Sequence, residues 1–258
     1  GGHSLVSRRR VVAGNWKLNK TVPETRRSLL ELRNKAAGLD AKADIIVFPS
    51  YVCLETAVDA TKDTRIHVGA QNVFWESSGA YTGEISVEML ESVGVSHVLI
   101  GHSERRSLFG ETDATVAARL GRVLKGSLTP VVCVGESLEE REANRTEEIL
   151  VGQVRGALSE VAPDHVSRLI LAYQPVWAIG TGKTASPETA NDAHALIRAA
   201  VAAIFDRSAA DGISILYGGS VKPENTASLM AESEIDGVLV GGASLDPSSF
   251  AEIVRAAG

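Results

Sequence analysis

An uncharged side chain lies at the centre of the segment whose residue types are most typical of a catalytic site. Residues 172–183 read Ala-Tyr-Gln-Pro-Val-Trp-Ala-Ile-Gly-Thr-Gly-Lys, with Gln174 between a tyrosine and a proline. A carboxylate of the same size would accept a proton at neutral pH, whereas the carboxamide of Gln174 cannot. Pro175 restricts the backbone at one end of the segment and Gly182 frees it at the other. This pattern indicates a lid over a site, with an ordinary strand-to-helix loop as the alternative.

Two other segments could stabilise negative charge. Residues 14–17 (Gly-Asn-Trp-Lys) would present Lys17 as a fixed positive charge, unless it is a solvated surface lysine. Residues 101–106 (Gly-His-Ser-Glu-Arg-Arg) place His102 at the expected start of a helix, whose partial positive charge disfavours the imidazolium form. A lone histidine is more often structural, but this run is more specific. A neutral His102 would donate one hydrogen bond to a ligand oxygen.

Two glycine pairs could hold an anion. Residues 217–220 (Tyr-Gly-Gly-Ser) and 240–244 (Val-Gly-Gly-Ala-Ser) follow the last two apolar runs of the chain. Glycine lets backbone N–H groups approach an anion closely, and a helix start beyond adds a favourable dipole. One such pair is a weak signal, but two at these two strand ends favour a phosphate site built from the amides of Ser220, Gly241 and Gly242.

Short runs rich in β-branched residues recur along the chain and predict eight strands. Most are continuously apolar, which is typical of strands buried on both faces in a parallel sheet. Stretches with helical spacing separate them, for example residues 23–37 and 113–125, and Ser186-Pro187-Glu188 has the composition of a helix start. The predicted strands cover residues 11–13, 45–48, 66–70, 97–100, 130–134, 169–172, 213–217 and 238–240.

Strands that alternate with helices indicate parallel βα units. Eight such units favour an α/β fold closed as a (β/α)8 barrel in a single domain, residues 10–258. An open doubly wound sheet is the alternative, because the spacing between the strands is uneven. Every candidate segment follows a predicted strand, so all should meet at the C-terminal face, where the active sites of such barrels lie.

The bulk composition agrees with one barrel. The chain has 258 residues, of which 44% are hydrophobic but only 5% aromatic, which predicts a core of Val, Ile, Leu and Ala. A net charge of −6 argues against nucleic acid or an anionic membrane as partner. No membrane-spanning run, signal peptide or metal-ligand cluster is visible, and Cys53 and Cys133 read as buried thiols of a reducing, cytoplasmic compartment. Residues 1–9 begin Gly-Gly-His-Ser without a methionine and are expected to be a disordered remnant outside the fold.

Together these segments resemble the triosephosphate isomerase family in five motifs, in the family's order, over residues 10–256. The resemblance implies a TIM barrel that interconverts dihydroxyacetone phosphate and D-glyceraldehyde 3-phosphate by proton transfer through an enediolate, in glycolysis and gluconeogenesis. It implies no metal or organic cofactor. Another phosphate-binding barrel, such as a sugar-phosphate aldolase or a synthase, would lack the joint pattern of Asn15, Lys17, His102 and the lid.

The resemblance also implies roles for single residues. Lys17 would neutralise the phosphate and the charge on the substrate oxygens, and Asn15 would help to position Lys17 and the ligand. His102 would be a neutral donor, a role for which this family is itself the standard case. Glu104 would pair with Lys17, unless it is an exposed acid at a helix start. The Gly180 N–H would bond the phosphate once the lid shuts.

A long loop, residues 71–86, follows the third predicted strand and carries Phe74, Trp75 and Tyr81. Exposed aromatic side chains are costly unless they are covered. In the resembled family this loop inserts into a neighbouring subunit, so the resemblance implies a homodimer in which Thr82 reaches the neighbour's active site. The alternative is a loop folded back on its own barrel.

Gln174 is the one departure from the family pattern that changes chemistry. The resembled family has a glutamate there, as the base that moves the substrate's proton. The resemblance therefore implies an aldose–ketose isomerase with strongly reduced activity that still binds its ligand. The near-isosteric change and the non-native N-terminus favour a deliberate Glu-to-Gln replacement, made to trap a complex. A naturally inactive barrel that binds triose phosphates is the alternative.

Overall fold

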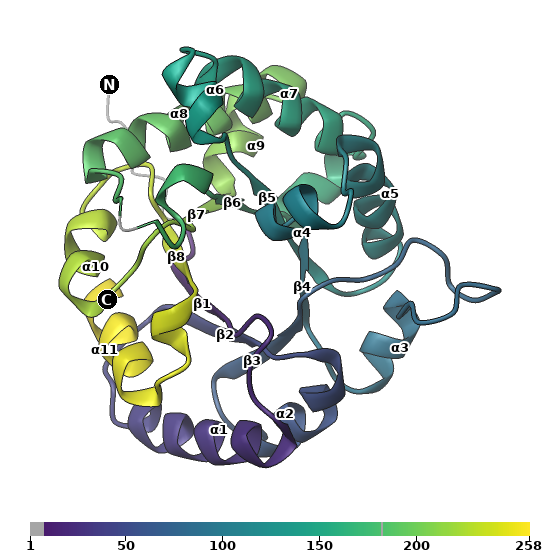
Figure 1. The fold of residues 1–258 in the computed structure, drawn as a ribbon, viewed down its shortest axis with the longest axis vertical. Helices are drawn as coiled ribbons and strands as arrows, with labels where there is room; N and C mark the ends of the chain where they lie inside the picture. The colour runs from purple at the N-terminus through teal and green to yellow at the C-terminus, as the bar shows by residue number, and fades with distance from the viewer. Residues whose placement is uncertain (1–7, 182) are drawn as a thin grey trace.

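A closed barrel organises the molecule. The computed structural model describes residues 8–181 and 183–258. In this part of the chain, eight parallel strands close in chain order, and helices surround them (Figure 1). The predicted (β/α)8 barrel is confirmed, and the open sheet is wrong. The strands are β1 Val11–Asn15, β2 Asp44–Phe48, β3 Ile66–Ala70, β4 His97–Ile100, β5 Thr129–Val134, β6 Ile170–Tyr173, β7 Ser214–Tyr217 and β8 Gly237–Val240.

Side chains near their first turns set where several helices begin. Ser186 Oγ accepts the Thr189 N–H ahead of a first-turn proline, so the predicted start of α8 is confirmed. Thr21 and Glu24 form a reciprocal capping pair at the start of α1. The helices are α1 Val22–Ala37, α2 Leu54–Ala60, α3 Val87–Ser92, α4 Ser103–Leu108, α5 Asp113–Leu124, α6 Leu138–Glu142, α7 Thr146–Leu158, α8 Pro187–Ile204, α9 Arg207–Gly212, α10 Pro223–Met230 and α11 Pro247–Ala257.

The barrel closes where its first strand meets its last. β1 pairs with β8 in parallel, from Val11 opposite Gly237 to Gly14 opposite Val240. A Cβ at Gly237 would overlap the Val11 carbonyl group, so the closing register depends on glycine at this position. Because all strands run the same way, their carboxyl ends and the loops that follow them gather at one rim.

Apolar residues fill two layers. A smaller group lies inside the barrel and a larger one lies between the strands and the helices. The inner group is mainly Val, Ile, Leu and Ala, as the composition predicts, and also holds Phe48 and the buried Cys133. It consists of Val11, Ala13, Ile46, Phe48, Leu99, Val131, Cys133, Ala172, Leu216 and Leu239.

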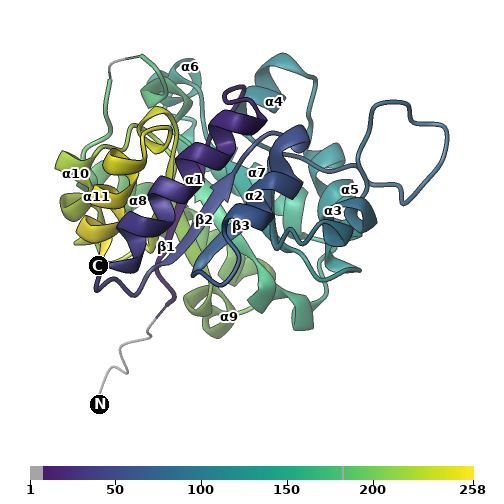
Figure 2. The ribbon, with the colours of Figure 1, turned by 90° about the horizontal axis from the view of Figure 1, so that it is seen from below.

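Two peripheral segments bear on the sequence-based predictions. The loop between β3 and α3 projects from the side of the barrel, as Figure 2 shows. Of the predicted remnant, residues 1–7 lie outside the described residues, whereas the side chains of Arg8 and Arg9 bind Asp236 at 2.7 Å and Asp44 at 2.5 Å. Residues 8 and 9 of the predicted remnant are therefore held against the barrel.

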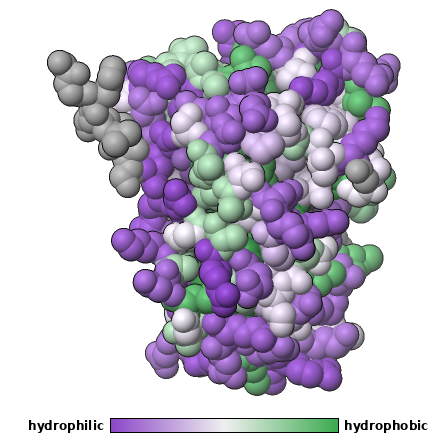
Figure 3. All heavy atoms as spheres, turned by 90° about the vertical axis from the view of Figure 1, so that its left-hand side faces the viewer, coloured by the Kyte–Doolittle hydropathy of each residue, from purple (hydrophilic) through white to green (hydrophobic). Residues whose placement is uncertain are grey.

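The outer surface is mostly polar on the side that carries α8, α10 and α11. Figure 3 shows hydrophilic side chains over most of this face, with apolar residues in smaller groups between them. No helix in residues 8–181 and 183–258 combines the length and the apolar character needed to cross a membrane.

Candidate active site

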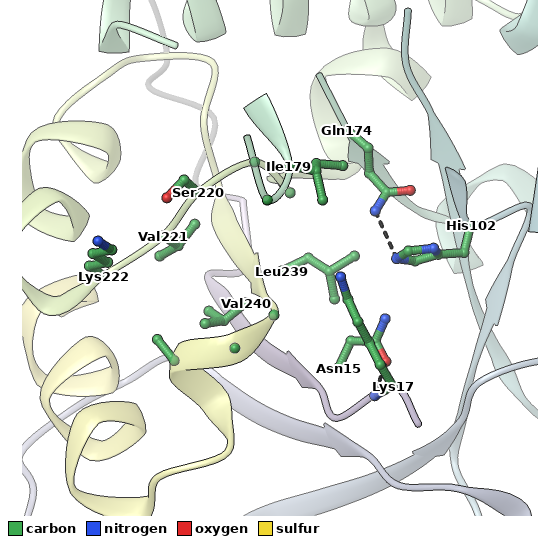
Figure 4. Close-up of a pocket in the computed structure, with 16 residues that line it drawn as sticks. Asn15, Lys17, His102, Gln174, Ile179, Ser220, Val221, Lys222, Leu239 and Val240 are labelled. Atoms are coloured by element: carbon green, nitrogen blue, oxygen red, sulfur yellow. Dashed lines mark hydrogen bonds between the residues drawn. The ribbon is translucent and has the colours of Figure 1, made fainter. Parts of the chain in front are cut away.

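A cavity of about 280 Å³ opens at the rim where the strands end. It is walled by the segments that follow β1, β4, β6, β7 and β8 (Figure 4). The structure thus brings together segments that lie more than 200 positions apart in the sequence. Eight of the nine residues predicted for the site line the cavity, namely Asn15, Lys17, His102, Gln174, Gly180, Ser220, Gly241 and Gly242.

The ninth residue, Glu104, lies beside the cavity and contacts its lysine. Lys17 Nζ is 2.7 Å from Glu104 Oε1. The backbone of Lys17 has a left-handed φ of 56°, which is uncommon for a residue with a side chain. The Asn15 carboxamide oxygen accepts the Lys17 N–H at 3.0 Å, and the Gln71 amide donates to the Lys17 carbonyl at 2.9 Å. These bonds hold the strained backbone in place and fix where the ammonium emerges.

His102 is buried at the start of α4. Its Nδ1 accepts the backbone N–H of Glu104 at 3.1 Å. The pKa of His102 is lowered to about 4, chiefly because burial disfavours the charged ring; the Lys17 charge lowers it further and the Glu104 charge opposes this. From the sequence we expect the helix terminus to keep the imidazole neutral. In the structure α4 has only six residues, and burial is the chief cause of the lowered pKa.

Gln174 follows directly on β6 and is 3% exposed. Its side-chain oxygen accepts the Ser103 N–H at 2.9 Å, and its side-chain nitrogen lies 2.9 Å from His102 Nε2. Figure 4 shows the carboxamide nitrogen pointing at the imidazole beside it. A Cβ at Gly135 would overlap the Gln174 carbonyl group, so the neighbouring strand end packs directly on this backbone. The position of side chain 174 is therefore closely defined.

The glycine pairs line the side of the cavity opposite His102. The loop after β8 continues as a 3₁₀ turn, Gly242–Ser244, and Ser244 Oγ donates to the Gly241 carbonyl at 2.7 Å. A Cβ built on Gly241 would lie 3.6 Å from Lys17 Nζ, so the ammonium and this glycine backbone face the same space. An anion there would meet a full positive charge and backbone amides together.

The predicted lid begins with a 3₁₀ turn at Val176–Ala178. Trp177 Nε1 donates to the Glu136 carboxylate at 2.8 Å, and the Tyr173 hydroxyl donates to the same oxygen at 2.6 Å. Burial raises the pKa of Glu136, and these hydrogen bonds counteract the rise. Gly180 is exposed with a φ of 67°, while the predicted hinge residue Gly182 lies outside the described residues.

Sequence reasoning missed three residues of this region. Gln71 follows β3 directly, Glu136 comes two positions after β5, and Lys222 lines the cavity ahead of α10. The signal that found His102, a polar residue just past a strand, applies equally to Gln71 and Glu136. Glu136 also follows Gly135 and precedes the charged residues 139–142, so a sequence signal was present there.

The loop of residues 71–86 differs in part from its prediction. Phe74 is buried between Trp75 and Tyr81, with ring centroids 4.2 and 4.9 Å away, so the aromatic side chains largely cover one another. Tyr81 is half-exposed and Thr82 is exposed. The loop projects rather than folding back on the barrel (Figure 2).

A second hollow, of about 330 Å³, adjoins the first and shares Asn15, Lys17 and His102 with it. Leu18 and Phe109 line it and are 97% and 64% exposed. Both are large apolar side chains that stand beside the charged residues of the site.

Within the described ranges, no three side chains of the His, Cys, Asp and Glu types are grouped as metal ligands.

Comparison with known proteins gives a consistent result. The family model described as triosephosphate isomerase matches residues 10–257. A triosephosphate isomerase of a type A strain of Clostridium botulinum is 52% identical over 245 residues, which cover 95% of this chain and 98% of the relative. One from Solibacter usitatus is 52% identical over 96% of this chain and 99% of its own length. One from Caldanaerobacter subterraneus is 48% identical with the same coverage of both chains.

Proposed function

The chain belongs to the triosephosphate isomerase family, and from this membership we propose that its cavity binds a triose phosphate. The substrates would be dihydroxyacetone phosphate and D-glyceraldehyde 3-phosphate, interconverted in glycolysis and gluconeogenesis in the cytoplasm. The observation that carries the proposal is one cavity that combines the Lys17 ammonium, the His102 imidazole and the two glycine pairs.

The phosphate would lie against the amides of Ser220, Gly241 and Gly242. These groups are donors without a competing carboxylate among the lining residues of this cavity. The Gly180 N–H would join them once the lid moves inward. Lys17 would balance the charge of the phosphate and of the enediolate oxygens, held in place by Asn15 and Glu104.

The reaction needs a base that takes a proton from one carbon and returns it to the neighbouring one. The side chain of residue 174 lies at the cavity wall beside His102, which suits that role. A carboxamide has no basic lone pair at neutral pH, so Gln174 leaves the site without its proton carrier. We therefore propose that this chain is an impaired Glu-to-Gln form that keeps its ligand affinity, because the groups assigned to the phosphate lie elsewhere.

A homodimer would complete the site. The hollow beside Lys17 and His102 is bordered by the exposed Leu18 and Phe109. The projecting loop of residues 71–86 offers the half-exposed Tyr81 and the exposed Thr82 as a matching insert. In this arrangement Thr82 of one protomer would reach the other protomer's active site.

A calorimetric titration of this chain with dihydroxyacetone phosphate tests the binding part of the proposal. Saturable binding that inorganic phosphate weakens by competition is expected. No heat of binding, or binding that inorganic phosphate leaves unchanged, would contradict a phosphate site in this cavity.

Gln174 also supports a second candidate, a barrel that binds triose phosphates without turning them over. Both candidates predict binding by this chain and differ in what Gln174→Glu does. An impaired isomerase regains turnover with a carboxylate at this position. A barrel adapted to binding alone stays inactive, because other groups would have drifted from catalytic geometry.

A further inference from the structure

Four groups at or beside the cavity form one continuous row of hydrogen-bond contacts. The Ser103 N–H meets the Gln174 side-chain oxygen at 2.9 Å, and the Gln174 side-chain nitrogen meets His102 Nε2 at 2.9 Å. His102 Nδ1 then meets the Glu104 N–H at 3.1 Å. The row therefore begins and ends on a backbone N–H, and each of these can only donate.

This row has one acceptor too few. Three contacts need three donors and three acceptors. The two backbone groups give two donors, the Gln174 carboxamide adds one donor and one acceptor in the row, and a neutral His102 ring adds one of each. The total is four donors and two acceptors, so one contact must bring two donors together. Protonating His102 would make the shortage worse, and its pKa, lowered to about 4 by burial, keeps the ring neutral at pH 7.

Burial decides which contact gives way. The contacts of Gln174 with Ser103 and with His102 are both buried, whereas the contact between His102 Nδ1 and the Glu104 N–H is only part-buried and is the longest of the three. A buried donor without a partner costs about 1–3 kcal/mol, so the least buried of the three contacts gives way at the lowest cost. The Glu104 N–H is therefore the group that loses its partner.

We infer that Gln174 holds His102 in the tautomer with its hydrogen on Nδ1, so that Nε2 accepts the Gln174 amide hydrogen and has none to donate into the cavity. Gln174 thus acts as a positioning residue on His102, in addition to lacking a basic group. A carboxylate at position 174 would supply two acceptors and no donor. All three contacts would then be satisfied, and only the tautomer with the hydrogen on Nε2 would satisfy them.

The tautomer follows from the hydrogen-bond row alone; its consequence for catalysis rests on the proposed function. In an isomerase, His102 would polarise the substrate carbonyl through an Nε2 hydrogen. The chain would then lack both the base and the hydrogen-bond donor of the reaction, although it differs from the family pattern of the site at only one side chain.

Nitrogen-15 NMR of the full chain at pH 7 tests the inference without reference to activity. Each imidazole nitrogen shows by its chemical shift and its couplings to the ring protons whether it carries hydrogen. His102 is identified among the six histidines as the signal set missing from a His102→Leu sample. Three proteins are compared: this chain, Gln174→Glu, and Gln174→Met, which matches the glutamine in length but has neither donor nor acceptor.

The hydrogen is expected on Nδ1 in this chain and on Nε2 in both variants. In Gln174→Met the Glu104 N–H alone decides the tautomer, and in Gln174→Glu the carboxylate favours the same tautomer. A hydrogen on Nε2 in this chain would overturn the inference, as would an imidazolium ring at pH 7. A hydrogen on Nδ1 in all three proteins would also overturn it, because Gln174 would then not be the cause. If Gln174→Glu does not fold, Gln174→Met still decides. The two proposals can fail separately. An NMR result against the tautomer would not affect the proposal of triose phosphate binding, and a failure to bind triose phosphate would not affect the tautomer.

Discussion

The Lys17 ammonium and the Glu104 carboxylate lie 2.7 Å apart and join the segment after β1 to the start of α4. Both side chains are partly exposed, so the pair contributes little to folding stability. The pair matters for the site because it fixes the position of the Lys17 ammonium at the cavity to which we assign the phosphate.

Replacing this lysine should weaken anion binding. For Lys17→Met we expect the dissociation constant for dihydroxyacetone phosphate to rise about tenfold or more, which corresponds to about 1.4 kcal/mol for the lost attraction between a unit charge and a phosphate. Calorimetric titration measures the change. Lys20→Met is the matched control, because it removes the same charge from a side chain outside the lining of the cavity and should change the affinity only slightly. Equal losses in both variants would contradict a specific role of Lys17.

The contribution of His102 to turnover should depend on residue 174. With a carboxylate there, His102 can donate through Nε2, and His102→Leu should lower kcat by about 10² to 10³, the usual cost of one such donor. In this chain the same replacement should cost far less, because that hydrogen is already missing. Steady-state assays of the four proteins measure the coupling. Equal fold-losses in the two backgrounds would contradict it.

Stability should fall in mild acid through His102. The folded state keeps the ring neutral down to its pKa of about 4, whereas the unfolded chain takes up a proton below the ordinary value of 6.5. The unfolded state therefore binds more protons in this window, and the free energy of unfolding decreases as the pH falls. Between pH 7 and pH 5 the share of His102 should be about 2 kcal/mol. Urea unfolding of this chain and of His102→Leu at both pH values should show a smaller decrease in the variant.

The proposed dimer makes a prediction on size. Sedimentation equilibrium should give twice the chain mass of 27.2 kDa. Phe109→Glu places a charge in the hollow beside the active site and should shift the protein toward monomer. Leu30→Glu is the control, since Leu30 is also partly exposed but lies on α1, away from that hollow. A monomeric parent chain, or dissociation by both replacements alike, would contradict the assigned interface.

The barrel could be predicted from local patterns to a large extent. Every predicted strand overlaps an observed strand to within about two residues at each end, because strands buried on both faces read as unbroken apolar runs. Closure itself could not be read from these runs, since it depends on contacts such as the pairing of Val11 with Gly237 at opposite ends of the chain.

The site was only partly visible in the sequence. Lys17 and His102 stand in distinctive runs, so their types and spacing pointed to chemistry. The role of Glu136 was hidden, because it arises from hydrogen bonds to Tyr173 and Trp177 that form only after folding. The shortage of acceptors around Gln174 was equally hidden. It depends on two backbone N–H groups whose direction no side-chain pattern reveals.

The most direct test of the central claim is the isomerase turnover of this chain beside Gln174→Glu, with intact-protein mass used to exclude deamidated glutamate in the parent sample. We expect the carboxylate to raise kcat by about 10⁴ or more, at or above the upper end for a positioned general base, while the affinity for phosphate ligands stays within several-fold. Equal turnover in the two proteins would contradict the account, because residue 174 would then not be where the base belongs.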